Sequence, residues 1–220
     1  MSQRIIVLLF LILTVPFAAV AQGGKVEAIG PLTDKSASQP VRTAIEAKGS
    51  RVTLTDGSVL GEIWMRSGLP VGAKTDGSSQ VYSTLGVSTL VGVINFPNSV
   101  NDFRGQSIKA GVYTLRYALH PSDGNHLGIS PIRDFLLLIP ASVDQTPDAK
   151  YKFEELVKMS AKASGTNHPA VISLVQPDNK AGSVVLTQNE HGHLIFATKI
   201  KSQSGPEVPI AFIIKGVAEQ

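Results

Sequence analysis

Apolar and polar residues alternate along most of the chain, and the alternation is clearest near its centre. In VYTLRYALH, residues 112–120, aromatic and aliphatic side chains fill every second position. A period of two that is rich in β-branched and aromatic residues predicts a strand. Residues 133–139 are apolar on both faces after the first two positions, which is typical of a strand covered on both sides. The two strands, joined by the polar connector 121–132, form the predicted central hairpin.

The same pattern predicts strands elsewhere, separated by turn signals such as the Asp56-Gly57 pair. They fall at residues 26–29, 51–54, 59–66, 89–96, 170–175, 183–188, 193–200 and 209–216. Helical periodicity is confined to residues 40–48, followed by Gly49 as a C-cap, and to residues 148–164, followed by Gly165.

This balance of elements predicts an all-β, mainly antiparallel fold: a β-sandwich, jelly-roll-like, with two short peripheral helices. The predicted core comprises Ile63, Leu90, Val93, Tyr113, Leu115, Tyr117, Phe135, Leu137, Phe196 and Phe212.

Residues 1–21 have the three parts of a secretory signal peptide. Arg4 supplies the positive charge, residues 5–15 form the apolar core, and Ala19-Val20-Ala21 is the small-residue cleavage site. The apolar run is shorter than the roughly 18–20 residues that span a bilayer. We therefore expect cleavage after Ala21, a periplasmic or secreted protein, and membrane contact only during export.

The expected mature chain, residues 22–220, is long enough for a single sandwich domain with an irregular N-terminal arm at 22–39. It contains no cysteine, which excludes disulfides, thiol nucleophiles and thiolate metal sites. The formal charge of the full chain is +3, and its basic residues are scattered rather than concentrated on one element, so no nucleic-acid binding is expected. No glycine-rich phosphate loop or Gly-x-Ser-x-Gly nucleophile motif occurs.

The central hairpin holds the densest group of residues capable of chemistry. His120 would face either Asp134 or Arg133 across the hairpin, depending on a one-residue shift in register. With His126 and Ser130 overhead, a His–carboxylate pair beside a hydroxyl is the arrangement of a general base. The candidate catalytic residues are His120, His126 and Asp134.

The alternative is that the polar residues of the connector serve its own folding. Asp123 and Asn125 can hydrogen bond to turn backbone, and the planar fork of Arg133 suits a carboxylate. We predict an ordered loop folded over the sheet, with Asp123 or a loop carbonyl bound by Arg133. The same polar residues are candidate ligand-binding groups, together with two residues of the predicted strands: Asp123, Asn125, Ser130, Arg133, Arg116 and Trp64.

Three further features each allow two interpretations. Trp64 lies between Glu62 and Arg66 on one strand face. It could be a stacking platform for a ring, or a partly buried side chain beside a surface ion pair. His191 and His193 form an H-x-H pattern that recurs in metal sites, but the spacing indicates no third ligand. Asp123-Gly124-Asn125 is similar to the start of a calcium loop but lacks the later oxygen ligands. No metal or cofactor is predicted.

The stretch AGVYTLRYALHPSDGNHLGISPIRDFLLLIP, with RVTLTDGSVLGEIWMR upstream, resembles an uncharacterised family of exported bacterial proteins. More loosely, it resembles a domain-of-unknown-function group with an Ala-Gly-x-Tyr-Thr/Ser-Leu strand in a small β-sandwich. The resemblance implies export and a β-sandwich, and it supplies no activity.

Two functions remain open from the sequence. The first is an exported, non-catalytic binding or assembly module that uses one end of the sandwich or the strand of Trp64. Its partner would be a small molecule, a glycan or a protein. The second is a hydrolase-type enzyme with a His/Asp site on the 120–134 loop.

Overall fold

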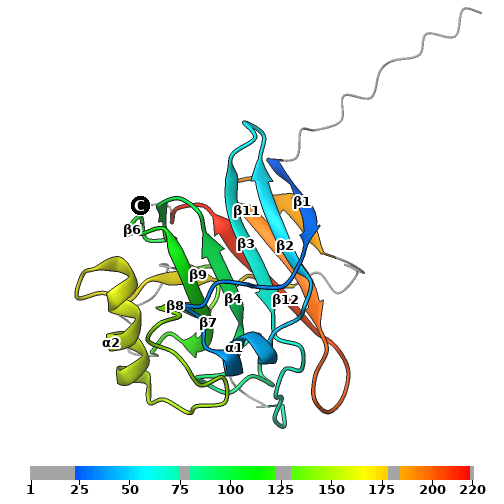
Figure 1. Cartoon of the computed structure of the whole chain (residues 1–220), viewed down its shortest axis with the longest axis vertical. Helices are drawn as coiled ribbons and strands as arrows, with labels where there is room; N and C mark the ends of the chain where they lie inside the picture. The colour runs from blue at the N-terminus through cyan, green and yellow to red at the C-terminus, as the bar shows by residue number, and fades with distance from the viewer. Residues whose placement is uncertain (1–22, 75–79, 122–129, 178–183, 219–220) are drawn as a thin grey trace, which may run out of the picture.

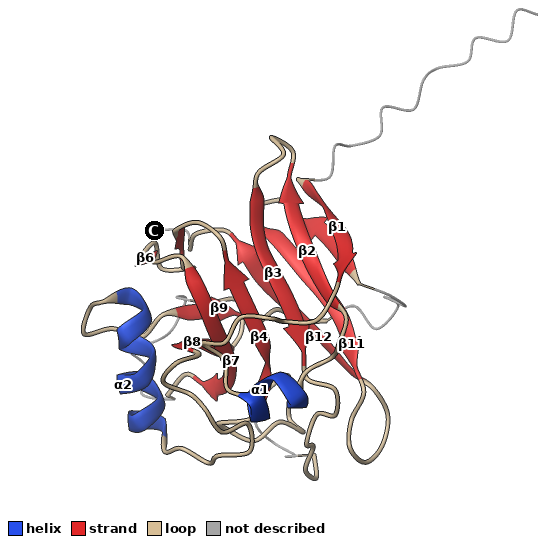
Figure 2. Ribbon diagram, in the orientation of Figure 1, coloured by secondary structure: helices blue, strands red, loops and turns tan. Residues whose placement is uncertain are grey.

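The computed structural model describes residues 23–74, 80–121, 130–177 and 184–218. Its strands form a larger antiparallel sheet of seven, ordered β1-β2-β3-β4-β7-β8-β9, and a smaller sheet of three, ordered β10-β11-β12 (Figure 1, Figure 2). The short strands β5 (Val100–Asn101) and β6 (Ser107–Ile108) pair as a separate two-stranded sheet. The larger sheet comprises β1 (Gly24–Ile29), β2 (Gly49–Leu54), β3 (Val59–Met65), β4 (Leu90–Phe96), β7 (Gly111–Leu119), β8 (Asp134–Pro140) and β9 (Val171–Ser173). The smaller sheet comprises β10 (Val185–Gln188), β11 (Leu194–Ile200) and β12 (Val208–Lys215).

The predicted all-β, antiparallel sandwich with two short helices is confirmed within the described residues. The helices are α1 (Gln39–Ala44) and α2 (Phe153–Ser164). The strand order differs from that of a jelly roll, in which successive strands alternate between the two sheets. Here strands that are consecutive in sequence stay neighbours along the larger sheet, and the last three strands build the smaller one.

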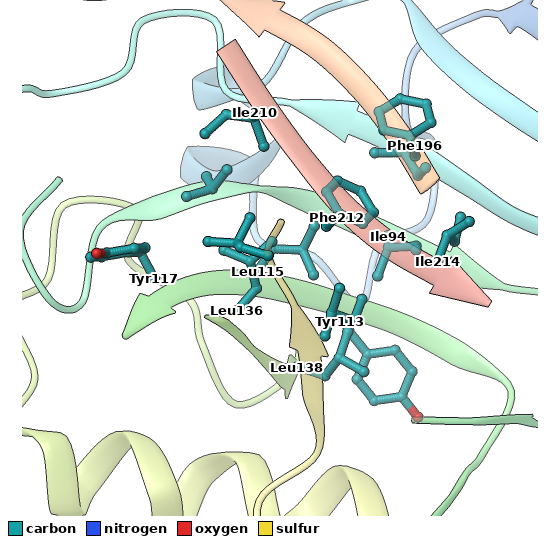
Figure 3. Close-up of a cluster of buried hydrophobic side chains, with 14 of the residues drawn as sticks. Ile94, Tyr113, Leu115, Tyr117, Leu136, Leu138, Phe196, Ile210, Phe212 and Ile214 are labelled. Carbon is teal, nitrogen blue, oxygen red and sulfur yellow. The ribbon is translucent and has the colours of Figure 1, made fainter. Parts of the chain in front are cut away.

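The main core lies between the two sheets (Figure 3). Side chains of the larger sheet, such as Leu115 and Leu136, meet Phe196 and Phe212 of the smaller sheet, whose rings lie 5.2 Å apart. All of the predicted core residues are buried. Burial of large aliphatic and aromatic side chains, worth about 1.5–3 kcal/mol each, is the principal force holding the sheets together.

The larger sheet is also covered on its opposite face. Near α1, Val41 and Leu32 of the N-terminal arm pack on Trp64 and Val93, and farther along the sheet Leu156 of α2 packs with residues of β8. This double coverage explains why β4 and β8 are apolar at nearly every position.

The first helix ends earlier than predicted. Ile45 already has extended backbone angles and forms an isolated bridge with Arg66, so α1 cannot continue to residue 48. Gly49 is the first residue of β2 rather than a helix cap. A Cβ at Gly49 would lie 2.5 Å from Nε1 of Trp64, so glycine is required there because the indole packs directly on the backbone.

The second helix begins later than predicted, at Phe153 rather than at residue 148. The carbonyls of Thr146, Pro147 and Ala149 accept hydrogen bonds from the guanidinium of Arg116 on β7. Backbone held in this way forms a turn, in which the N–H of Ala149 donates to the carbonyl of Thr146, and does not enter the helix. The end of the helix agrees with the prediction, because Gly165 caps it at a φ of 68°.

Arg116 and Asp144 form a fully buried ion pair on this face. Nε and Nη2 of Arg116 donate to the two carboxylate oxygens at 2.7 Å each, and Thr114 donates to the same carboxylate at 2.6 Å. Nη1 of Arg116 also donates to the carbonyl of Ser88. Arg66, the residue directly after β3, binds Asp148 at 2.6 Å. Two arginines of the larger sheet therefore fix segment 144–151 to its outer face.

Replacement of Arg116 by methionine is expected to lower the free energy of unfolding by about 3–5 kcal/mol, because Asp144 would stay buried without its counter-charge. Arg51→Met is the matched control, because Arg51 pairs with Glu62 in the same sheet but its side chain is 43% exposed. That exposed pair is expected to contribute about 0–1 kcal/mol. Urea unfolding of the two variants measures the difference, and equal losses would contradict the role given to the buried pair.

Candidate functional site

The register of the central hairpin places His120 opposite Arg133. Leu119 pairs with Asp134, and the backbone N–H of His120 donates to the carbonyl of Arg133 at 2.9 Å. Because successive side chains on a strand point to opposite faces, His120 and Asp134 lie on different faces of the larger sheet. The imidazole of His120 stacks on Phe135, with ring centroids 4.2 Å apart.

Asp134 is instead a structural residue of the main core. Its buried carboxylate accepts from the backbone N–H groups of Val81 and Tyr82, at 3.0 Å each, and from the hydroxyl of Tyr117 at 2.6 Å. The predicted His120–Asp134 general-base pair is therefore wrong, because the sheet separates the two side chains. His126, the third candidate catalytic residue, lies outside the described residues.

Arg133 closes the base of the hairpin. Its Nε and Nη2 donate to the carbonyl of His120, the residue just before the connector, at 3.2 and 2.8 Å. The expected acceptor was Asp123 or a loop carbonyl. Asp123 and Asn125 lie outside the described residues, so their predicted roles remain predictions. Ser130, at the other end of the connector, donates to the hydroxyl of Ser173 at 3.1 Å.

Trp64 and Arg116, the two candidate ligand-binding residues within strands, are both buried. Trp64 is 4% exposed, and its Nε1 donates to the carbonyl of Gly30 at 2.9 Å, so its ring offers no open face for stacking. Its neighbour Glu62 pairs with Arg51 rather than with Arg66. Arg116 is fully buried, and its guanidinium is bound to Asp144 and to backbone carbonyls. Both predicted ligand-binding roles are replaced by structural ones.

His191 and His193 lie side by side in the turn between β10 and β11, with ring centroids 5.8 Å apart. Nε2 of His193 lies 3.0 Å from the carbonyl of Val217, and its ring packs edge-on against Phe103. Across the described ranges, no group of three or more His, Asp or Glu side chains could hold a metal ion.

These histidines border a cleft of about 570 Å³ at one end of the sandwich, here called the end cleft. The β2–β3 turn projects at this end, and the C-terminal part of the chain also lies there (Figure 1). Four separate segments contribute to it: the β2–β3 hairpin, residues 98–101, the β10–β11 turn and the end of β12. The lining residues are Leu54, Ser58, Val59, Leu60, Asn98, Ser99, Val100, Asn101, His191, Gly192, His193, Ile214, Lys215, Gly216 and Val217.

Some of the polar lining residues are exposed and make no side-chain hydrogen bond within the described structure, whereas Ser58 and the buried His193 are hydrogen bonded to neighbouring residues. The side chains of Asn98, Ser99 and Asn101 make no hydrogen bond to any residue that the structure describes. Lys215 is exposed and forms no ion pair within the same ranges. The nearby Asp56 is held in its own turn, where hydrogen bonds from Ser58 chiefly, and the charge of Lys215 in addition, lower its pKa.

The sequence signal at this cleft was the H-x-H pattern of His191 and His193, and nothing marked the other lining residues. Asn98, Ser99 and Asn101 stand in an ordinary polar loop, and Lys215 ends an apolar strand. A second cleft, of about 500 Å³, adjoins the first, and both are bordered by His191 and His193. Among the central-hairpin candidates that the structure describes, Ser130 lines the second cleft.

Comparison of the chain with protein-family models, with curated proteins and with solved structures finds no match. The resemblance to an exported bacterial family therefore stays an expectation. Over the ranges that the structure describes, no helix combines the length and the apolar character needed to cross a membrane.

Arg133→Lys tests the clamp at the base of the hairpin. A lysine cannot reproduce the two donors that converge on the carbonyl of His120, so the free energy of unfolding is expected to fall by about 1 kcal/mol. Proteolysis within residues 121–132 is expected to become faster. Arg104→Lys is the control, because the exposed Arg104 side chain makes no such contact in the described structure. Unchanged stability together with unchanged proteolysis would refute the clamp.

All four tyrosines of the chain are expected to resist ionisation in the folded protein. Burial raises the pKa of each above the ordinary value of 10.0, and the negative charge of Asp134 adds to the rise at Tyr82 and Tyr117. The unfolded chain releases these protons near pH 10 while the folded chain retains them, so the free energy of unfolding should fall as the pH rises above about 10.

An ultraviolet titration of phenolate absorbance checks this expectation. In native protein the signal should develop only above pH 10 and together with alkaline unfolding, whereas protein unfolded in urea should titrate near 10. A native fraction that titrates reversibly at the ordinary value would show that at least one phenol is not protected.

Proposed function

We propose that the protein is an exported, non-catalytic binding module and that its ligand occupies the end cleft. The observation that supports this most directly is the contrast between two groups of polar residues. Those of the central hairpin and the outer face, such as Asp134 and Arg116, are buried and bound by their own chain. Those at the end cleft are exposed, and several make no contact that the fold requires.

The size of the end cleft favours a small molecule over a protein or a long glycan as the partner. Ligand pockets generally measure about 300–1,000 Å³ and combine apolar walls with a few polar groups. The end cleft, at about 570 Å³, has both components. The strand of Trp64, the alternative binding surface expected from the sequence, has less support because the indole is buried.

Export is part of the proposal and rests on the sequence of residues 1–21. A positive residue, a short apolar run and a small-residue cleavage site precede a chain without cysteine. The protein would then act in the periplasm or outside the cell.

The hydrolase alternative lacks a supporting observation among the described residues. Its proposed pair is divided by the sheet, since His120 stacks on Phe135 while Asp134 is hydrogen bonded to Tyr117 in the main core.

A thermal-shift screen of residues 22–220 against small acids, amines, sugars and divalent metals tests the proposal. A ligand present at about a hundred times its Kd should raise the melting temperature by roughly 5–10 °C. Ser99→Trp places an indole in the end cleft and should abolish the shift. Ser107→Trp is the control, because Ser107 is also exposed but does not line the cleft. A ligand whose shift survives Ser99→Trp would place binding elsewhere and overturn the assignment.

A further inference from the structure

The side chain of Lys215 contributes an ammonium group to the end cleft, and no aspartate or glutamate belongs to the described lining. The nearby Glu190 borders the second cleft, where its carboxylate lies 3.6 Å from Nε2 of His191. Asp56, whose carboxylate interacts electrostatically with Lys215, is fully exposed and already accepts from the backbone N–H and the hydroxyl of Ser58, at 2.9 and 2.6 Å. Such a lining attracts an anion and disfavours a cation.

Neutral hydrogen-bonding groups come from a different segment of the chain. Asn98, Ser99 and Asn101 follow one another on the segment between β4 and β6 (Ser107–Ile108), which includes the short strand β5 (Val100–Asn101). Amide and hydroxyl groups donate hydrogen bonds to carboxylate oxygens as readily as to water. Together with Lys215 on β12, they offer hydrogen-bond donors from two segments of the lining.

The remaining lining is aliphatic. Leu60 of β3 and Ile214 of β12 are 8% and 6% exposed, and they continue the main core toward the end of the sandwich. Burial of a ligand's methylene groups against such a wall contributes about 0.8 kcal/mol per group. The described lining contains no Phe, Tyr or Trp, and so lacks the aromatic platform on which sugar rings stack.

We propose that the end cleft binds a small carboxylate with an aliphatic body, the carboxylate near Lys215 and the body against Leu60 and Ile214. This inference rests on the proposed binding function and narrows its ligand class. The carboxylate would interact with the ammonium of Lys215, which forms no ion pair among the described residues, and the aliphatic body would pack against the apolar lining.

Octanoate is the probe, and isothermal titration of residues 22–220 is the measurement. Octanamide has the same body without the charge and is expected to bind about five-fold more weakly, which is the upper end for a partly exposed ion pair. Acetate has the charge without the body and should give no measurable binding. Octylammonium, with the opposite charge, should bind more weakly than octanamide.

Lys215→Met should weaken octanoate about five-fold and leave octanamide unchanged, because only the carboxylate interacts with the ammonium. Lys158→Met is the control for a general loss of positive charge, because Lys158 is exposed on α2 and does not line the cleft. Its octanoate affinity should equal that of the unaltered protein.

The outcomes separate the ligand class from the function. Equal affinities for octanoate and octanamide, or no effect of Lys215→Met, would overturn the carboxylate class; if Ser99→Trp still abolished binding, the cleft would stand as the binding site. Octanoate binding that survives Ser99→Trp would overturn both. No binding of octanoate at all would overturn the carboxylate class alone, and the ligand screen would then decide the function.

Discussion

The buried ion pair between Arg116 and Asp144 sets the arrangement of one whole face of the larger sheet. Two charges without access to water are tolerated only when hydrogen bonds satisfy all their polar atoms. Here Thr114, Ser88 and the carbonyls of segment 144–151 complete that set. The segment must therefore lie flat on the sheet, which delays the start of α2 and closes this face. At the end cleft, by contrast, Asn98, Ser99 and Lys215 are exposed and make no side-chain hydrogen bond to the described residues.

Buried carboxylates also fix two other connectors among the described residues. Asp134 binds the backbone of residues 81 and 82, and Asp102 accepts from the N–H groups of Arg104 and Gln106. Each carboxylate fixes a connector that is distant in sequence or irregular in shape. In a chain without cysteine, these buried carboxylates do the cross-linking that disulfides do in many small exported proteins. The hydrogen bonds that these buried carboxylates accept hold the connectors in place.

The strands could be predicted because a period of two reports directly on a sheet with a buried face, as in residues 112–120. The helix ends could not, because they depend on contacts distant in sequence: Ile45 bridges Arg66, and Arg116 holds the carbonyls before α2. The candidate site was misassigned for a related reason. A shift of one residue in register moves Asp134 from beside His120 to the opposite face, and the pattern of apolar residues does not fix that register when both faces are buried.

The end cleft escaped prediction because, apart from the H-x-H pattern of His191 and His193, none of its residues is unusual alone. Four segments bring together two asparagines, a serine, a lysine and an aliphatic wall, and only their convergence makes a site. Substitutions in the core and substitutions in the cleft should therefore differ in their cost in stability. The residues that hold the fold are buried and bound to one another, so changes there cost stability. Asn98, Ser99 and Lys215 are exposed, so substitutions at these positions should change the lining of the cleft at little cost in stability.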